Sequence, residues 1–201
     1  SRQAKSIEIS PEMRARFELD ADRMTPDEFI HALLKAPVDL VWNGGIGTYV
    51  KAASETHGDA GDKANDAVCV NGAELRCRVF GEGGNLGLTQ RGRVEAALAG
   101  VALNTDFIDN SGGVDCSDHE VNIKLLLGEV MAAGDMTEKQ RNALLASMTE
   151  AITELVLTNN FRQAQVLALI ERHARGRLGE YQRFITAMIA NQGLDRALEH
   201  L

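Results

Sequence analysis

The sequence has 201 residues and is acidic, with 29 aspartate and glutamate residues, 21 lysines and arginines, and a formal net charge of −8. This balance leaves no basic stripe to neutralise phosphates, which argues against a general nucleic-acid binder. Hydrophobic residues make up 44% of the chain, which is enough for a core, and the apolar runs are too short to span a bilayer.

The cysteines and histidines show no metal-binding pattern. Cys69, Cys77 and Cys116 lack metal-ligand spacing, and there is no H-x-x-x-H or C-x-x-C pair, so we expect no metal site. An odd number of cysteines, without the spacing of a disulfide framework, is typical of reduced thiols in a cytoplasm. The residues from Ser1 to Lys5 show neither an initiator methionine nor a signal-peptide pattern. We therefore expect a piece of a longer, cytoplasmic protein.

Two short helices are predicted near the start of the chain. Ser10 suits the N-cap of the first, and Pro11 suits its first helical position. Thr25 and Glu28 form a capping box at the start of the second helix. Pro37 should end that helix.

Strands and helices then alternate, which predicts a parallel sheet. A short buried strand is expected at residues 38–42, with Trp42 in the core, and a second strand at residues 77–80. Further strand pieces are expected at residues 101–103 and 107–108.

The segments between these strands contain one predicted loop, one turn and one helix. The apolar residues of 51–66 follow neither a helical nor a strand period, so this segment is interpreted as a loop. Asn71 could cap a single turn. Thr89 should cap a helix that runs through Ala99. The residues expected on its inward face are Val94, Ala97 and Leu98.

After Ser117, the apolar residues recur only at the spacing typical of helices. One helix is marked by apolar residues from Ile123 to Met131. A capping box at Thr137 starts the next helix, whose apolar residues continue to Val156 at helical spacing. Further helices are expected at residues 161–173 and around residues 181–189, with a last short helix after Gly193.

Two glycine-rich junctions are the most informative feature. The first, Gly81–Thr89, follows a predicted strand, and the second, Asn110–Ser117, precedes a helix expected to begin near Ser117. In an open α/β sheet, such junctions bring ligands to backbone N–H groups at helix starts. The first junction is not a G-x-G-x-x-G motif, because Leu86 occupies the last glycine position. The second suits a carboxylate or a phosphate.

Each candidate also has a purely structural interpretation. The first junction could be a tight turn, although the Asn85 amide can both donate and accept hydrogen bonds. Ser117 forms a capping box with Glu120 and could serve its own helix. A cluster of polar residues could orient a substrate or form a solvated loop. It comprises Asp62, Lys63, Asn65 and Asp66.

Four blocks of the sequence resemble the large bacterial NAD-specific glutamate dehydrogenases. They are Val38–Lys51, Gly61–Ala67, Gly81–Gly87 and Asp109–Asn122. Two of them are also similar to the E-G-A-N and N-A-G-G-V-x-x-S segments of the smaller glutamate dehydrogenases. Gly84 and Ser111 replace alanines of those segments, and we regard both changes as tolerable.

The resemblance implies that the chain contacts NAD. Asn85 would contact the ribose on the nicotinamide side, and Asn110 would hold the nicotinamide carboxamide. Gly44 and Gly45 would lie under the cofactor, and Gly84 would also belong to this site.

The resemblance also implies a pocket for L-glutamate or 2-oxoglutarate. Val114 and Ser117 would line it, and the Ser117 hydroxyl would donate to the side-chain carboxylate of glutamate. The parent enzyme would transfer a hydride from the glutamate Cα to the nicotinamide and hydrolyse the imine to 2-oxoglutarate and ammonium. The family's catalytic lysine and aspartate lie upstream and are not identifiable here, so the isolated chain should be inactive.

The predicted fold class is α/β. Residues 1–116 would form a partial NAD-binding Rossmann-type domain with a parallel sheet, and residues 117–201 an all-helical C-terminal segment. The expected partners are the other domains of the parent chain and further copies in a homo-oligomer, with no nucleic acid and no membrane. The alternative is a non-catalytic regulatory or oligomerisation module whose glycine turns are architectural.

Overall fold

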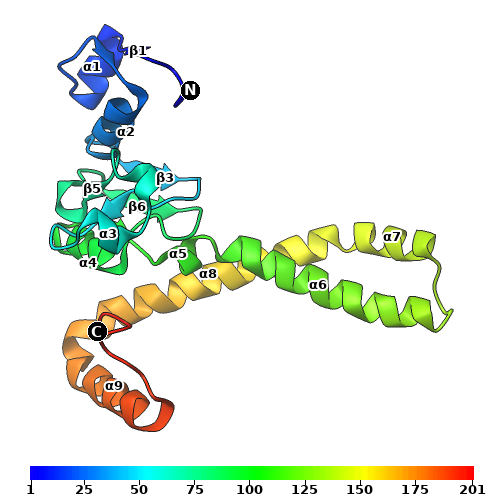
Figure 1. Ribbon diagram of the computed structural model, residues 1–201. Coiled ribbons are helices and arrows are strands. Elements are labelled where there is room, and N and C mark those ends of the chain that lie inside the picture. Colours follow the sequence, from blue (N-terminus) through cyan, green and yellow to red (C-terminus); the bar gives the residue numbers. More distant parts are fainter. The chain divides into compact units, whose positions relative to one another are not determined.

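The computed structural model describes residues 1–201, which divide into two compact units, Ser1–Asp109 and Asn110–Leu201. The first unit mixes helices with short strands, and the second unit is helical (Figure 1). The predicted mixture of helices with a small parallel sheet is therefore confirmed. None of the helices is both long enough and apolar enough to cross a bilayer.

The first unit opens with a small hairpin and two helices. These elements are β1 (Ile7–Glu8), α1 (Pro11–Phe17), β2 (Arg23–Met24) and α2 (Pro26–Leu34), and β1 pairs with β2 in antiparallel orientation. The Ser10 hydroxyl accepts a hydrogen bond from the Met13 N–H at 3.2 Å. Thr25 and Glu28 form the complete capping box before α2. Both predicted helix starts are confirmed.

A three-stranded parallel sheet forms the centre of the first unit. Its strands, in spatial order, are β3 (Leu40–Asn43), β6 (Val79–Glu82) and β7 (Ala102–Leu103). One face, which carries Phe80, packs into the core. The buried core residues are Leu34, Val50, Val70, Leu75, Cys77, Phe80, Leu88, Ala96 and Val101.

The opposite face of this sheet is exposed, which corrects the prediction of a buried strand with Trp42 in the core. Trp42 is 59% exposed, and Leu40 and Val79 on the same face are also exposed. Successive side chains of a strand point to opposite faces, so a sheet covered on one side buries only every second residue. In β3 the half-buried residues are Val41 and Asn43.

The remaining elements of the first unit lie between these strands or follow the last of them. They are β4 (Val50–Lys51), α3 (His57–Ala60), η1 (Lys63–Asn65), β5 (Val70–Asn71), η2 (Gly72–Glu74), α4 (Gln90–Leu98) and α5 (Asp106–Asp109). The predicted turn after Asn71 and the Thr89 cap are confirmed. The loop prediction for residues 51–66 is wrong in part, because α3 and η1 lie within it. Residues 107–108 belong to α5 and not to a strand.

The inward face of α4 also differs from the prediction. Its buried residues are Gly92, Arg93 and Ala96, whereas Val94 is exposed and Leu98 is 85% exposed. A side chain at Gly92 would place its Cβ 3.0 Å from the Lys51 backbone, so the helix packs here through its bare backbone. Apolar periodicity gives the wrong face because a glycine and a charged residue make the closest contacts.

The second unit consists of helices. They are α6 (Ser111–Ala132), α7 (Glu138–Ser147), α8 (Thr149–Ala174), η3 (Arg175–Arg177) and α9 (Leu178–Gln192), and α6 and α8 lie side by side (Figure 1). The Thr137 capping box is confirmed. Helix α8 is continuous where two helices were predicted, and residues after Gly193 form turns and not a helix. Leu127 is the single buried hydrophobic residue of this unit.

Candidate functional site

Two loops meet at the carboxyl ends of the parallel strands β3 and β6. We call them together the glycine corner, defined as residues 43–48 and 83–88. The Gly83 N–H donates to the Asn43 carbonyl oxygen at 2.8 Å. The Thr48 hydroxyl donates to the Leu86 carbonyl oxygen, also at 2.8 Å. The structure therefore brings together the predicted cofactor residues of this unit, which are Gly44, Gly45, Gly84 and Asn85.

Glycine is required where the two loops touch. A Cβ at Gly84 would lie 2.9 Å from the Gly45 carbonyl oxygen, whereas a Cβ at Gly45 would meet nothing within 4 Å. Glycine in place of the alanine of the E-G-A-N segment is thus more than a tolerable change, because the absence of a side chain lets the two backbones approach. Both loops present backbone at the strand ends, where open α/β sheets bind their ligands.

The Trp42 indole lies beside the glycine corner. A Cβ at Gly81 would be 2.5 Å from Trp42 Cε3, and a Cβ at Gly83 would be 2.8 Å from Trp42 Nε1. The ring therefore lies against the glycine face of β6 and keeps its other face exposed. Gly81 and Gly83 therefore provide room for the neighbouring Trp42 side chain.

Leu86 adopts a backbone conformation that usually requires glycine. Its φ is +59°, a left-handed conformation that costs a residue with a side chain about 1–2 kcal/mol. Its N–H donates to Asp106 Oδ2 at 2.7 Å, and its carbonyl oxygen accepts from Thr48. The loop thus places Leu86 where a dinucleotide fingerprint has its last glycine, and hydrogen bonds at both ends hold it there.

A buried ion pair lies next to the glycine corner and stabilises it. Glu82 is 0% exposed, and its Oε2 lies 2.7 Å from Arg93 Nε. The second oxygen, Oε1, accepts from Arg93 Nη2 and from the Leu88 N–H, each at 3.0 Å. Asp106 Oδ1 lies 3.4 Å from Arg93 Nη2. Both oxygens of the Glu82 carboxylate are thus occupied, so this group orders the loop.

Part of the polar cluster near residue 62 also supports the corner. Asp62 Oδ2 accepts from the Asn65 amide at 2.6 Å and from the Thr48 N–H at 2.8 Å. The Asn65 side-chain hydrogen bond, followed by the Thr48 backbone bond, holds the pKa of Asp62 below its ordinary value. Asn65 is buried, and Lys63 is exposed. Asp62 and Asn65 are therefore structural supports for Thr48, a role that sequence composition alone did not separate from a solvated loop.

The remaining predicted residues lie at the start of α6 in the second unit. Asn110 precedes the helix, and Val114 and Ser117 are exposed on it. Their spacing of four and three residues places all three within about 60° of one another around the helix axis. The start of α6 therefore carries the predicted substrate residues on one exposed face.

The capping interpretation of Ser117 is wrong. Helix α6 begins at Ser111, so Ser117 lies inside it, and its hydroxyl donates to the Gly113 carbonyl oxygen at 3.1 Å. The N–H groups left without intrahelical acceptors belong to the first turn, after Asn110, and not to the turn that begins at Ser117. Ser117 thus has no capping role that would compete with ligand binding.

The family described as "Bacterial NAD-glutamate dehydrogenase, catalytic domain" matches residues 1–170. The chain belongs to this family. It is 66% identical over 200 residues to the NAD-specific glutamate dehydrogenase of Pseudomonas aeruginosa and 60% identical over 200 residues to that of Halomonas elongata. It is 46% identical over 207 residues to that of Mycobacterium tuberculosis. Each match covers 100% of the chain, which spans only 12–13% of the length of these relatives.

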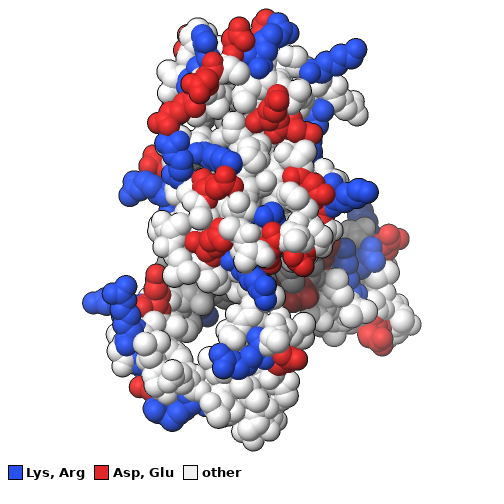
Figure 2. Space-filling view, turned by 60° about the vertical axis from the view of Figure 1, so that its left-hand side comes forward, with Lys and Arg blue, Asp and Glu red and all other residues white.

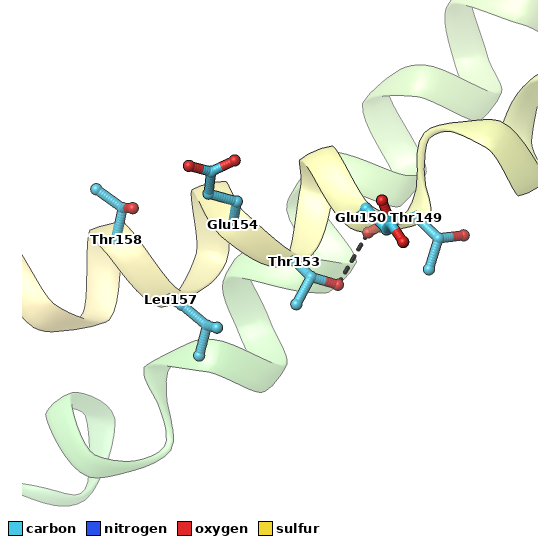
Figure 3. A pocket seen from close by; sticks show the side chains of 6 residues that line it. All are labelled: Thr149, Glu150, Thr153, Glu154, Leu157 and Thr158. Carbon is cyan, nitrogen blue, oxygen red and sulfur yellow. Dashed lines mark hydrogen bonds between the residues drawn. The ribbon is translucent and has the colours of Figure 1, made fainter.

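A hollow on helix α8 of this glutamate dehydrogenase family member does not gather polar groups around one point (Figure 3). This hollow is lined by residues of that one helix, which are Thr149, Glu150, Thr153, Glu154, Leu157 and Thr158 (Figure 3). Their polar groups do not converge, and the bond drawn joins the Thr153 hydroxyl to the Thr149 carbonyl oxygen within the helix. On the face drawn in Figure 2, basic and acidic side chains are interspersed and form no continuous basic surface.

Proposed function

We propose that this chain is part of the catalytic domain of an NAD-dependent glutamate dehydrogenase. The parent enzyme converts L-glutamate, NAD and water into 2-oxoglutarate, ammonium and NADH. The observation that carries the proposal is the glycine corner, where two loops at the ends of parallel strands touch at Gly45 and Gly84. The family membership of the chain and the names of its relatives support the same reaction.

In this proposal the first unit contributes part of a Rossmann-type cofactor cleft. Bound NAD supplies the hydride acceptor. Gly44, Gly45 and Gly84 let the cofactor approach the backbone, and the Asn85 amide contacts the nicotinamide-side ribose. Residues 1–116 belong to the NAD-binding domain, and residues 117–201 form the helical segment.

The start of α6 contributes one wall of the substrate pocket. The Ser117 hydroxyl, which now donates to a helix carbonyl, turns to donate to the side-chain carboxylate of glutamate. Val114 supplies an apolar contact beside it, and Asn110 holds the nicotinamide carboxamide. The catalytic lysine and aspartate come from other parts of the parent enzyme, so the isolated chain does not catalyse the reaction.

The test is glutamate-dependent NADH formation by the intact enzyme and by two asparagine variants. We expect Asn110→Ala to reduce kcat/KM at least tenfold by loss of a polar contact to the nicotinamide. Asn122→Ala, an exposed asparagine further along α6, is the matched control and should retain activity. Equal activities of the two variants would remove Asn110 from the site. NADH formation by the isolated chain would contradict its proposed inactivity.

A second, non-catalytic role is favoured by the sparse core of the second unit. Leu127 is its single buried hydrophobic residue, while Leu157, Phe161 and Leu169 on α8 are exposed. Such surfaces suit contacts with other domains of the parent or with further subunits. Sedimentation of the intact enzyme with Leu157→Ser and Phe161→Ser tests this role. A reduced mass supports subunit assembly through α8, and an unchanged mass argues against it.

A further inference from the structure

Helix α8 makes specific contacts with the first turns of α6. The Asn160 amide donates to the Ser111 hydroxyl at 2.8 Å, and the Asn159 amide donates to Asp115 Oδ2 at 2.9 Å. A Cβ at Gly112 would lie 3.6 Å from Val156 Cγ1, so the helices are in close contact there. These contacts join residues 44 and 49 positions apart in the sequence.

The start of α6 needs external support because its own sequence stabilises it poorly. Gly112 and Gly113 occupy its first turn, and each glycine costs a helix about 1 kcal/mol relative to alanine. Two of the contacts from α8 fall on this same turn, at Ser111 and Gly112, and Ser111 is buried.

The contacts also fix which way α6 faces. Asp115 Oδ2 is held by Asn159, and Asp115 Oδ1 lies 3.5 Å from His119 Nε2. Two residues along a helix correspond to about 160° of separation around its axis, so Ser117 lies almost opposite Asp115. The α8 amides thus hold a negative charge on the packed side of α6, away from the exposed face.

We propose that Asn159 and Asn160 are positioning residues for the substrate-binding face of α6. They do not touch the substrate. They fix the rotation and the position of the turn that presents Val114 and Ser117. The inference rests on the proposed function, and it gives α8 a part in the reaction that its sequence does not reveal. Displacements of about 1 Å in such a site can reduce rates by about a hundredfold.

The test is a double-mutant cycle on the Ser111–Asn160 hydrogen bond in the intact enzyme. Ser111→Ala and Asn160→Ala should each raise the glutamate KM about three- to tenfold, as expected for one hydrogen bond. The double variant should show no further increase, because both changes remove the same bond. Gln165→Ala removes an exposed amide from the outer surface of α8 and is the matched control.

The outcomes separate the inference from the function on which it rests. An unchanged glutamate KM with a lower thermal midpoint shows a merely structural bond and overturns the inference. If the increases in glutamate KM of the two single variants add up in the double variant, the inference is overturned as well. If Asn160→Ala does not fold, Ser111→Ala, which removes one oxygen atom, decides alone by the same glutamate KM. An unaltered enzyme that forms no NADH from glutamate refutes the proposed function itself, and the inference falls with it.

Discussion

Replacing Arg93 with methionine probes the buried support of the glycine corner. The change keeps most of the apolar stem and removes the guanidinium that neutralises Glu82 at 2.7 Å and contacts Asp106 at 3.4 Å. Glu82 is 0% exposed, so its carboxyl group would lose its counterion at a position without access to water. Breaking a buried pair by removing one partner costs about 3–5 kcal/mol.

A second variant tests whether this loss comes from the unpaired charge. Glu82→Gln combined with Arg93→Met removes the charge but keeps an oxygen that can accept from the Leu88 N–H. Replacing a buried pair by uncharged groups is often close to neutral. We therefore expect the double variant to recover about 2 kcal/mol of the loss.

The assay is urea unfolding of the 201-residue chain followed by tryptophan fluorescence. The chain has one tryptophan, Trp42, which lies on the sheet of the first unit, so the signal reports that unit. Arg91→Met is the matched control, because Arg91 is exposed on the same helix, and its effect should stay within about 0.5 kcal/mol. A loss below about 1 kcal/mol for Arg93→Met would refute the reasoning.

Three further predictions concern the glycine corner. Gly84→Ala should destabilise the first unit by about 1–3 kcal/mol because its Cβ meets the Gly45 carbonyl, whereas Gly45→Ala should have little effect in the same urea assay. Leu86→Gly should be neutral or stabilising by up to about 1 kcal/mol, and a clear loss in thermal midpoint would show that the backbone is not strained. The lowered pKa of Asp62 contributes stability above the unfolded value of about 3.9, and this contribution disappears as the pH falls through the folded value. Asp62→Asn should therefore flatten the acid dependence of unfolding, and an unchanged profile would argue against the Asp62 contacts.

The sequence predicted the features that depend on local chemistry. The caps at Ser10, Thr25, Thr89 and Thr137 are all confirmed, because each is decided by residues within one turn. The parallel sheet was also predictable from the alternation of strands and helices. Faces and helix limits were less predictable, because they depend on which neighbours cover an element.

Residues from distant segments explain the errors. Trp42 was predicted in the core, yet it lies on a sheet face that nothing in the first unit covers. Val94, Ala97 and Leu98 were predicted on the inward face of α4, but Arg93 is buried there instead because it pairs with Glu82. The two glycines led to the prediction of a loop at the start of α6. The structure shows a helix there, and the Asn160 side chain of α8 bonds to it from 49 positions away in the sequence. None of these pairings leaves a local signal in the sequence.

The most direct test of the proposed division of roles compares two variants of the intact enzyme. Asn85→Ala should raise the KM for NAD and leave the KM for glutamate unchanged. Ser117→Ala should raise the glutamate KM, because the loss of a bond to a charged group weakens glutamate binding by about 1–3 kcal/mol. It should neither lower the thermal midpoint nor change the NAD KM. An unchanged NAD KM in the first variant, or an unchanged glutamate KM in the second, would contradict the account.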